Sequence, residues 1–370
     1  MKEINATALR ERLEAGESLE VVDIRDREEF DAWHIFGSRN VPVYEALGQG
    51  RAEGLAQHAE SLPRDRPIVT VCRAGRMSQR AAGLLESMGF DAISLSGGIR
   101  GWGAVWSVAE IPFEGAAVFL QIRRNGKGCL SYLFGKDGQA CVVDPCVEVD
   151  TYLTTARENG LDIVQVLETH VHADHLSRAR ELARLTGASL LLPRNDRVTF
   201  EYEAINDGAD LTVGGLPVEV IATPGHTGES TCYLVDKKVL LTGDTLFASA
   251  VGRPDLERGD EGADAGAHAL FNSLQEKLLG RFDDVPFYSA HTSDAIGFDR
   301  QPIGGSIATA RKDLDLLALE EQPFVDRILA SLQPKPPNHH TIIAVNEGKQ
   351  DLGLTDPLDV EAGPNRCAAG

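Results

Sequence analysis

The sequence predicts two α/β domains in tandem: a parallel sheet with helices on both faces, followed by a sandwich of two mixed sheets with helices outside. The chain has 370 residues, which is long enough for two substantial cores. Short apolar strands alternate with helical segments over residues 1–110, as in a parallel sheet covered on both faces. Residues 118–346 instead combine tightly turned strands with intervening helices. Residues 111–117 are expected to be a linker and residues 347–370 a C-terminal tail.

The composition is that of a globular protein, with 42% hydrophobic and 25% charged residues. A formal net charge of −20 argues against nucleic acid as a partner, because the phosphate backbone requires a basic surface. No basic-plus-apolar leader and no membrane-length apolar run appear, so a cytoplasmic protein without membrane contact is expected. The scattered cysteines suggest reduced thiols rather than a disulfide framework. They are Cys72, Cys129, Cys141, Cys146, Cys232 and Cys367.

The first domain can be followed element by element. Asn5 can cap a helix over residues 6–15 that stops at Gly16. Strands are expected over residues 19–24 and 67–71, and helices over 26–32 and 78–89. This order places Cys72 at the end of the second strand, directly before a helix.

Cys72 has the sequence context of a reactive thiol. The loop after it contains Arg73, Gly75 and Arg76, and backbone N–H groups at the following helix N-terminus would point toward the sulfur. Both arginines and the helix dipole favour a thiolate, so Cys72 is predicted to be nucleophilic. The alternative is a buried, inert cysteine at a strand end.

This region resembles a rhodanese (sulfurtransferase) domain. The resemblance implies that Cys72 carries a sulfane sulfur as a persulfide, with Arg73 and Arg76 beside it, and exchanges it between persulfide, thiosulfate and sulfite. It further implies that Asp23 and Arg25 are scaffold residues, while His34 is expected to be structural. The matching segments are Val22-Asp23-Ile24-Arg25, residues 33–42, residues 72–77 and residues 97–102.

The second domain begins with three strands, over residues 119–123, 129–134 and 140–143, followed by a helix over 149–159. Two later hairpins are expected to turn at Gly214-Gly215 and at Asp236-Lys237-Lys238. Beyond Asp313 the pattern becomes helical. Residues 334–346 are expected to pack back as an extended segment, with His339 and His340 at the surface. The tail, including Cys367, is expected to be loose.

A dense cluster of ionisable residues follows the apolar strand over residues 163–167. It contains His170, His172, Asp174 and His175, ahead of a helix expected over residues 173–186. His226, Asp244 and His291 each follow a later strand, where chemistry is common in layered α/β folds. Burying so many ionisable groups together is costly unless a cation compensates them, so the cluster predicts a metal site.

Two ligand sets remain open from the residues. His170, His226 and Asp244 form a two-histidine, one-carboxylate set, which suits one Fe(II) per chain with positions left for a substrate and O2. All seven residues could instead hold two Zn ions, with Asp244 bridging them and a hydroxide attacking an ester or thioester. Ligand counting does not decide between these sets.

The second domain resembles the metallo-β-lactamase fold superfamily, on the His-x-His-x-Asp-His motif with His226, Asp244 and His291. The run Gly243-Asp244-Thr245-Leu246-Phe247 leading into Val251-Gly252-Arg253-Pro254-Asp255-Leu256 is similar to its persulfide dioxygenase branch. That resemblance implies mononuclear iron on His170, His226 and Asp244. The remaining four residues, His172, Asp174, His175 and His291, would then orient the ligands and exclude a second ion. Arg253 and Asp255 would shape the substrate mouth, or form an internal salt bridge.

The two resemblances together predict a persulfide dioxygenase–rhodanese fusion that serves sulfide detoxification. A low-molecular-weight thiol persulfide, of glutathione or a similar thiol, would react with O2 to give sulfite and the free thiol. Cys72 would interconvert thiosulfate and sulfite, in a direction that the sequence leaves open. A homodimer is expected from the family. The alternatives are a dizinc thioester hydrolase resembling glyoxalase II with an accessory rhodanese domain, and a sulfur carrier whose metal domain only binds a partner.

Overall fold

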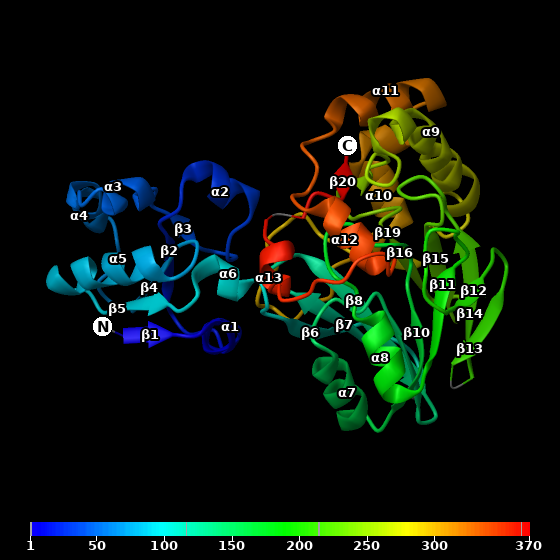
Figure 1. Cartoon of the computed structure of the whole chain (residues 1–370), viewed down its shortest axis with the longest axis horizontal. Coiled ribbons are helices and arrows are strands. Elements are labelled where there is room, and N and C mark those ends of the chain that lie inside the picture. Colours follow the sequence, from blue (N-terminus) through cyan, green and yellow to red (C-terminus); the bar gives the residue numbers. More distant parts are fainter. Residues whose placement is uncertain (1, 116, 214, 364) are drawn as a thin grey trace.

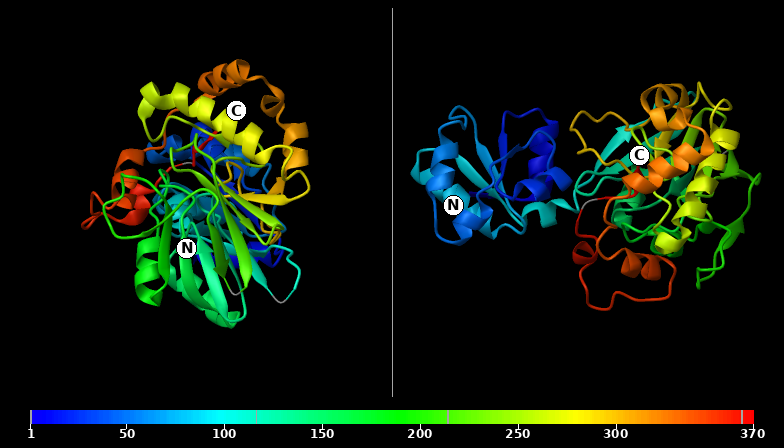
Figure 2. Two further views of the ribbon diagram at one scale, coloured as in Figure 1. Left: turned by 90° about the vertical axis from the view of Figure 1, so that its right-hand side faces the viewer. Right: turned by 90° about the horizontal axis from the view of Figure 1, so that it is seen from above.

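The computed structural model describes residues 2–115, 117–213, 215–363 and 365–370, arranged as two lobes (Figure 1). Gly214 of the expected hairpin turn, Ala116 of the expected linker and Pro364 of the tail lie outside the described residues. The smaller lobe contains the N-terminal sheet and the larger lobe the remaining sheets (Figure 2). No helix among the described residues has the length and apolar character needed to cross a bilayer.

The N-terminal domain is built on a five-stranded sheet in the order β1-β5-β4-β2-β3, and every pair is parallel. Its strands are β1 (Lys2–Ile4), β2 (Glu20–Asp23), β3 (Arg39–Asn40), β4 (Ile68–Val71) and β5 (Ala92–Leu95). Its helices are α1 (Ala6–Glu14), α2 (Arg27–Ala32), α3 (Tyr44–Gly48), α4 (Glu53–Ala59), α5 (Arg76–Ser87) and α6 (Gly98–Trp102). The expected cap is present, because Asn5 Oδ1 accepts a hydrogen bond from Ala8 N at 2.8 Å.

Successive side chains along each strand point to opposite faces, so this sheet has a separate core on each face. Val22 packs with Leu47, Leu55 and Leu85 on one face, which α3, α4 and α5 cover. Its neighbour Val21 joins the opposite core, which α1 and α6 cover. A parallel sheet must be buried on both faces, and the prediction of this arrangement is confirmed.

The C-terminal domain contains two larger mixed sheets. The seven-stranded sheet has the order β12-β11-β10-β9-β8-β7-β6, and the six-stranded sheet has the order β13-β14-β15-β16-β18-β19. The first comprises β6 (Ser107–Glu110), β7 (Val118–Arg124), β8 (Cys129–Lys136), β9 (Gln139–Val143), β10 (Asp162–Leu167), β11 (Ser189–Pro193) and β12 (Glu203–Ile205). The second comprises β13 (Asp210–Val213), β14 (Leu216–Ala222), β15 (Thr231–Val235), β16 (Val239–Gly243), β18 (Pro286–Ser289) and β19 (Gly305–Ser306).

The two sheets enclose one core, to which Phe119 and Tyr132 contribute from one sheet and Val220 and Tyr233 from the other. The helices α7 (Val149–Glu158) and α8 (Ala179–Thr186) cover the outside of the seven-stranded sheet. The outside of the six-stranded sheet is covered by α9 (Gly259–Asn272), the π-helical turn Ser273–Leu278, α10 (Ile307–Asp313), the 3₁₀ turn Asp315–Ala318 and α11 (Glu321–Ser331). The layer order is therefore αββα, as predicted.

The chain end is ordered, in contrast to the loose tail expected from sequence. Residues 334–346 were expected to be extended, but α12 (His339–Asn346) is a helix whose Ile342 packs against Leu176. It is followed by α13 (Pro357–Val360) and by β20 (Ala368–Ala369), which pairs antiparallel with β17 (Val251–Gly252). Cys367 is consequently buried rather than loose.

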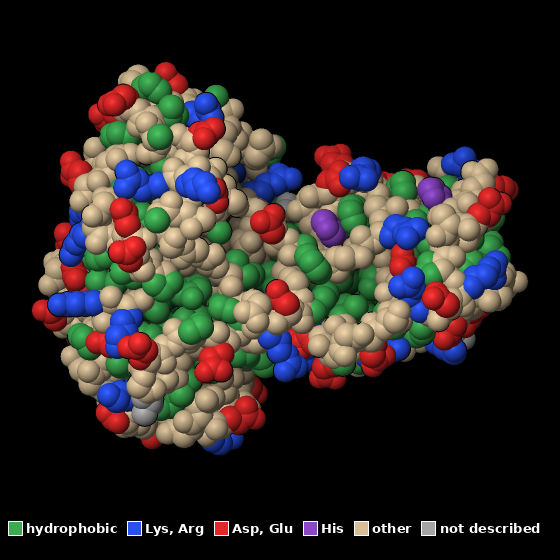
Figure 3. Space-filling model, turned by 180° about the vertical axis from the view of Figure 1, so that it is seen from behind, with side chains coloured by type: hydrophobic (Ala, Val, Ile, Leu, Met, Phe, Trp, Pro, Cys, Tyr) green, Lys and Arg blue, Asp and Glu red, His purple; other side chains and the backbone are tan. Residues whose placement is uncertain are grey.

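The region expected to link the domains also differs. Ser107–Glu110 forms β6 at the edge of the seven-stranded sheet and pairs with β7, so regular structure of the larger lobe begins before residue 111. The lobes meet through aromatic and charged contacts. Phe298 packs edge-on to Trp102, and Arg100 of α6 pairs with Asp356 and Asp359 beside α13, which lies next to α6 in Figure 1. The surface on the reverse side mixes acidic and basic side chains over both lobes (Figure 3).

Candidate metal centre and persulfide loop

The histidine cluster lies in a loop, because β10 ends at Leu167 and α8 begins only at Ala179. The helix expected from residue 173 thus starts six residues later. Side chains satisfy the loop backbone where helical hydrogen bonds would otherwise form: Leu176 N donates to Glu361 Oε1 at 2.7 Å, and Ser177 N donates to Asn346 Oδ1 at 2.9 Å. This irregular backbone lets His170, His172 and His175 project in different directions.

The structure brings His170, His226 and Asp244 together. Their ligand-capable atoms all lie within 4.8 Å of one another, and all three residues are at most 2% exposed. Asp244 Oδ2 lies 3.7 Å from His170 Nε2 and 3.5 Å from His226 Nε2. The close packing of β16 against Thr169 requires glycine at position 243. Gly243 has a φ of +52°, and a Cβ added there would lie 2.8 Å from the side chain of Thr169.

Hydrogen bonds fix which ring nitrogen of each histidine is available. His226 Nδ1–H donates to the carbonyl oxygen of Arg253 at 2.7 Å. His170 Nδ1–H donates to Thr169 Oγ1 at 2.9 Å, whose hydroxyl in turn donates to Asp144 Oδ2 at 2.8 Å. Both Nε2 atoms are therefore left with lone pairs, which is the arrangement that metal-binding histidines have.

A hydrogen bond also fixes the orientation of the Asp244 carboxylate. His291 Nδ1–H donates to Asp244 Oδ1 at 2.6 Å and leaves Oδ2 facing the two Nε2 atoms. Asp244 Oδ2, His170 Nε2 and His226 Nε2 are all buried without a hydrogen-bond partner. Three converging, unpartnered acceptors are costly in a protein interior unless a cation binds them, so these residues fit one metal ion.

The other three histidines of the cluster, His172, His175 and His291, each contact an acidic side chain. Asp174 lies between His175 and His291, with Asp174 Oδ1 3.1 Å from His175 Nδ1 and Asp174 Oδ2 2.9 Å from His291 Nε2. His172 Nε2 lies 3.1 Å from Asp144 Oδ1 and 3.1 Å from Glu168 Oε2. These contacts hold His172 in a group with two acids, separate from the triad of His170, His226 and Asp244.

Burial and neighbouring charges shift the pKa values of the histidines in different directions. Burial and the imidazoles of His172 and His226 hold the pKa of His170 well below its usual range, and burial lowers the pKa of His226. Burial opposes protonation of His291, but Asp174 and Asp244 raise its pKa to about 10. The lowered pKa values favour the neutral form of the two triad histidines, which is the form that binds a metal, whereas the two carboxylates favour the protonated form of His291.

Two cysteines near the metal residues were not anticipated from the sequence. Cys129 Sγ lies 3.5 Å from Asp174 Oδ2, and Cys129 can group with Asp174, His175 and His291 around an ion. Cys367 groups with Asp244 and His291. Only the fold brings them close: an isolated bridge pairs Cys129 with His291, and Arg253 N donates to the carbonyl oxygen of Cys367. Asp144 was missed for the same reason, whereas Glu168 lies only two residues before His170 in the sequence and was overlooked.

Arg253 and Asp255 form an internal salt bridge, one of the two roles expected for them. Arg253 Nε and Nη2 donate to Asp255 at 2.7 and 2.9 Å, and both residues are nearly fully buried. The guanidinium also donates to the carbonyl oxygens of Gln333 and Arg366. These contacts use four of the five N–H groups of the guanidinium and attach the chain end to β17.

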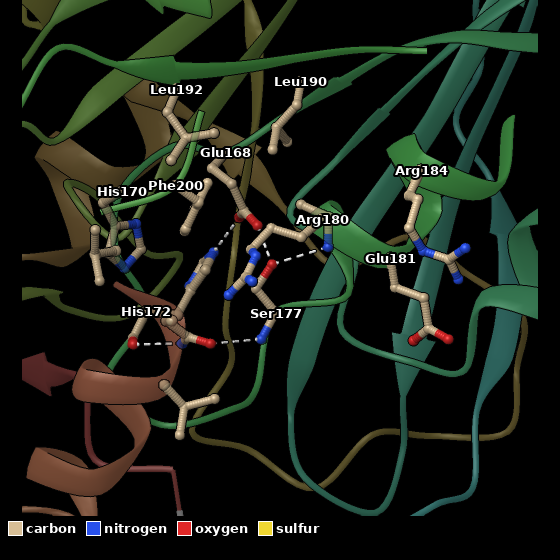
Figure 4. Close-up of a pocket in the computed structure, with 14 residues that line it drawn as sticks. Glu168, His170, His172, Ser177, Arg180, Glu181, Arg184, Leu190, Leu192 and Phe200 are labelled. Carbon is tan, nitrogen blue, oxygen red and sulfur yellow. Dashed lines mark hydrogen bonds and ion pairs between the residues drawn. The ribbon is translucent and has the colours of Figure 1, made fainter. Parts of the chain in front are cut away.

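A cavity of about 390 Å³ opens beside the metal loop (Figure 4). His170 and His172 line its inner end, together with Glu168 and Ser177, which bond each other. Burial is the main cause that raises the pKa of Glu168 to about 7. The outer lining combines basic and apolar side chains with the acidic Glu181, which suits an amphipathic molecule. Its residues include Arg180, Arg184, Leu190, Leu192 and Phe200.

Cys72 lies in a tight loop between β4 and α5, as predicted. Its Sγ accepts a hydrogen bond from Gly75 N at 3.1 Å and lies 3.4 Å from Ser78 Oγ. Gly98 packs against this loop with φ of +57°, and a Cβ there would lie 2.2 Å from the carbonyl oxygen of Cys72. The thiol is only 1% exposed, and the inward-pointing N–H would stabilise negative charge on sulfur.

The two loop arginines differ in their surroundings. Arg73 turns away to Glu29, with Nε–Oε1 of 2.7 Å, and to Asp26, while its guanidinium lies over Tyr44. Arg76 is exposed and has no hydrogen-bond or ion-pair partner among the described residues. Asp23 and Arg25 form the expected scaffold pair, because Arg25 contacts both carboxylate oxygens of Asp23 and the carbonyl oxygen of Trp33. His34 stacks on Phe30, a structural contact.

Comparison with known proteins finds a matching family for each half of the chain. The metallo-β-lactamase superfamily model matches residues 124–292, and the rhodanese-like domain model matches residues 5–105. The human protein named persulfide dioxygenase ETHE1, mitochondrial, is 30% identical over 235 residues, which cover 60% of this chain and 85% of that protein. A hydroxyacylglutathione hydrolase of Prochlorococcus marinus is 33% identical over 177 residues, covering 43% of this chain and 63% of the hydrolase.

The crystal structure of ETHE1 from Myxococcus xanthus superposes with a TM-score of 0.56 at 28% identity, covering 63% of this chain and all of that one. The chain therefore belongs to the metallo-β-lactamase superfamily and carries a rhodanese-like domain on its N-terminal side. Within that superfamily it is a homologue of persulfide dioxygenase ETHE1 at about 30% identity, and proteins named as hydroxyacylglutathione hydrolases are also among its relatives.

Proposed function

We propose that this protein oxidises a low-molecular-weight thiol persulfide with O2 at a single ferrous ion and transfers sulfane sulfur through Cys72. The observation that carries the proposal is the set of three converging, unpartnered atoms, His170 Nε2, His226 Nε2 and Asp244 Oδ2. In the overall reaction RSSH, O2 and H2O give RSH, sulfite and two protons. The homology to ETHE1 supports the same activity.

Iron held by His170, His226 and Asp244 would supply the dioxygen chemistry and leave positions for the substrate. The rest of the cluster orients this set. Thr169 and Asp144 fix the tautomer of His170, the carbonyl oxygen of Arg253 fixes that of His226, and His291 fixes the rotation of Asp244. Asp174 engages His175 and His291, and this charge pairing disfavours a second cation between them.

The rhodanese-like domain would perform a separate sulfur transfer. A thiol persulfide would deliver its outer sulfur to the Cys72 thiolate and leave as the free thiol, and the N–H of Gly75 would stabilise the resulting Cys72 persulfide. Sulfite would then remove that sulfur as thiosulfate and restore the thiolate. Arg76, which is exposed and unpaired among the described residues, is placed to attract such anions to the loop.

A dizinc thioester hydrolase is the second candidate. It is favoured by the relatives named as hydroxyacylglutathione hydrolases and by the presence of Asp174, His175 and His291 in one group with Cys129. In that function His172, His175 and His291 would be metal ligands. Their contacts with Asp144, Glu168 and Asp174 would then have to be rearranged around the two ions.

Metal analysis combined with oxygen uptake tests the proposal. The protein, purified anaerobically and loaded with Fe(II), is expected to hold about one iron per chain and to consume O2 with glutathione persulfide, releasing sulfite. Other thiol persulfides, including that of coenzyme A, would be compared in the same electrode. Two zinc ions per chain together with thioester hydrolysis in the absence of O2 would refute the proposal in favour of the hydrolase.

A further inference from the structure

A second cavity, of about 660 Å³, lies between the two domains. The N-terminal domain contributes Trp33, Arg73 and Ala74 to its wall, and α6 contributes Ile99 and Arg100. The opposite wall comes from the β7–β8 turn and from the chain end, including Lys127, Gly363 and Arg366. It is distinct from the cavity beside the metal loop, because the two share no lining residue.

The lining of this interdomain cavity is cationic, although the whole chain carries a net charge of −20. Six lining residues are basic and three are acidic. Four of the basic residues have carboxylate partners, which for Arg73 is Glu29 and for Arg124 is Glu361. They are Arg25, Arg73, Arg100 and Arg124.

Lys127 and Arg366 have no carboxylate partner among the described residues. Lys127 is 5% exposed, and its Nζ donates to the carbonyl oxygens of Glu361 and Gly363 at 2.8 and 2.9 Å. Arg366 Nη1 donates only to the carbonyl oxygen of Pro334 at 3.3 Å. A nearly buried ammonium without a counter-charge is costly, and an anion in the cavity would compensate it.

The cavity lies next to the loop that follows Cys72, and its lining also includes sequence neighbours of two cysteines of the metal cluster. On one side Arg73 and Ala74 directly follow Cys72, whose carbonyl oxygen accepts a hydrogen bond from Ile99 N. On the other side Lys127 is two residues from Cys129, and Arg366 precedes Cys367, and both of these cysteines group with His291. A small anion in the cavity would therefore lie beside the loop that follows Cys72 on one side, and beside Lys127 and Arg366 on the other.

We propose that this cavity binds a sulfur oxyanion, sulfite or thiosulfate, and holds sulfite beside the Cys72 loop for transfer of the outer sulfur. The proposal rests on the proposed function for the origin of the sulfite. In the transfer, the sulfur lone pair of sulfite forms a bond to the outer sulfur of the Cys72 persulfide. The Sγ–S bond breaks and its electron pair remains on the Cys72 thiolate, so the products are thiosulfate and free enzyme without any other oxidant. Net sulfur flow then runs toward thiosulfate.

Calorimetric titration with sodium sulfite tests the binding step. The full-length, iron-loaded chain with Cys72→Ser, which cannot form a persulfide, is expected to bind one sulfite per chain, more weakly at higher salt. Adding Lys127→Gln and Arg366→Gln should weaken binding at least about tenfold, equivalent to about 1.4 kcal/mol. The matched control removes two exposed cations elsewhere, Lys238→Gln and Arg281→Gln, and should leave binding within about twofold.

Three results would overturn the proposal: no saturable sulfite binding, equal loss in the control pair, or binding that survives the cavity pair and disappears with Asp244→Ala. If the double variant does not fold, Arg366→Gln alone still changes a partly exposed cation and should weaken binding several-fold. In chains that retain Cys72, the cavity pair should raise the KM for sulfite while leaving persulfide loading of Cys72 by glutathione persulfide unchanged. Oxygen uptake reports separately on the proposed function, so sulfite binding without oxygen uptake would leave the cavity assignment standing.

Discussion

His291 Nδ1 lies 2.6 Å from Asp244 Oδ1, and this short contact divides the carboxylate of Asp244 into two roles. Oδ1 is occupied by the imidazole, whereas Oδ2 faces the Nε2 atoms of His170 and His226. One carboxylate oxygen thus remains for a metal, and its direction is set by a residue from a different strand end. In a site with two metals, His291 would bind the second ion through Nε2, which has no hydrogen-bond partner, while Nδ1 kept its contact with Asp244.

Replacing His291 with alanine therefore distinguishes one metal from two. The His291→Ala variant is expected to keep one iron per chain but to bind it about 10–100-fold more weakly, because Asp244 loses the donor that orients it. His291→Asn, which retains an N–H donor, should recover part of the affinity. Elemental analysis gives the stoichiometry and chelator competition the affinity. A fall from two ions per chain to one would indicate the dinuclear site.

The two proposed centres should be separable by substitution. Asp244→Ala is expected to abolish iron binding and oxygen uptake, because it removes the only acidic member of the triad, while thiosulfate sulfurtransfer persists. Cys72→Ser should do the reverse, since serine cannot form a persulfide. Both activities are measured on each variant with added glutathione persulfide. Loss of oxygen uptake in Cys72→Ser would show that the centres depend on one another.

The layers and the residues of the metal cluster could be predicted from the sequence because local pattern encodes them. An apolar run of strand length before His170 indicates a strand end, and the close spacing of three histidines and Asp174 has few structural explanations. The partners of those histidines could not be predicted. Asp144 lies 25 residues before Thr169, and nothing in either segment shows that the fold places their side chains 2.8 Å apart.

The order of the chain end also could not be predicted from the sequence. Residues 361–370 are mostly small and include Gly and Pro, which is typical of a disordered segment, but long-range contacts order the described ones. Lys127 binds the carbonyl oxygens of Glu361 and Gly363, and β20 pairs with β17. Similarly, the run 334–338 contains three prolines and predicts an extended chain, but Pro337 and Asn338 form a turn and α12 begins at His339.

Arg184 is expected to bind the carrier part of the persulfide substrate. It lies on α8 at the rim of the cavity that His170 lines, it is exposed, and it has no ion-pair partner among the described residues. Arg184→Ala should raise the KM for an anionic persulfide about two- to fivefold with kcat unchanged, because an exposed ion pair contributes about 0.2–1 kcal/mol. Arg157→Ala on α7 serves as the control. A lowered kcat with unchanged KM would contradict this role.

The buried pair of Glu361 and Arg124 predicts how stability depends on pH. Burial opposes ionisation of Glu361, but Arg124 at 2.7 Å outweighs it and lowers the pKa of the carboxyl below its ordinary value. A depressed pKa in the folded state means that the carboxylate contributes stability above its unfolded pKa of about 4.3 and loses that contribution as the pH falls through the folded value. Glu361 also accepts from Leu176 N and so connects the chain end to the metal loop.

Glu361→Gln is therefore expected to lower the free energy of unfolding at pH 7 by about 3 kcal/mol, because Arg124 is left buried without a counter-charge. The difference between wild type and variant should shrink as the pH is lowered below about 4, where the wild-type carboxyl also becomes neutral. Urea unfolding of the metal-free proteins at several pH values measures both quantities. Asp359→Asn, which removes an exposed partner of Arg100, should cost less than about 1 kcal/mol at any pH. A difference for Glu361→Gln that stays constant down to pH 3 would show that the ion pair is not its cause.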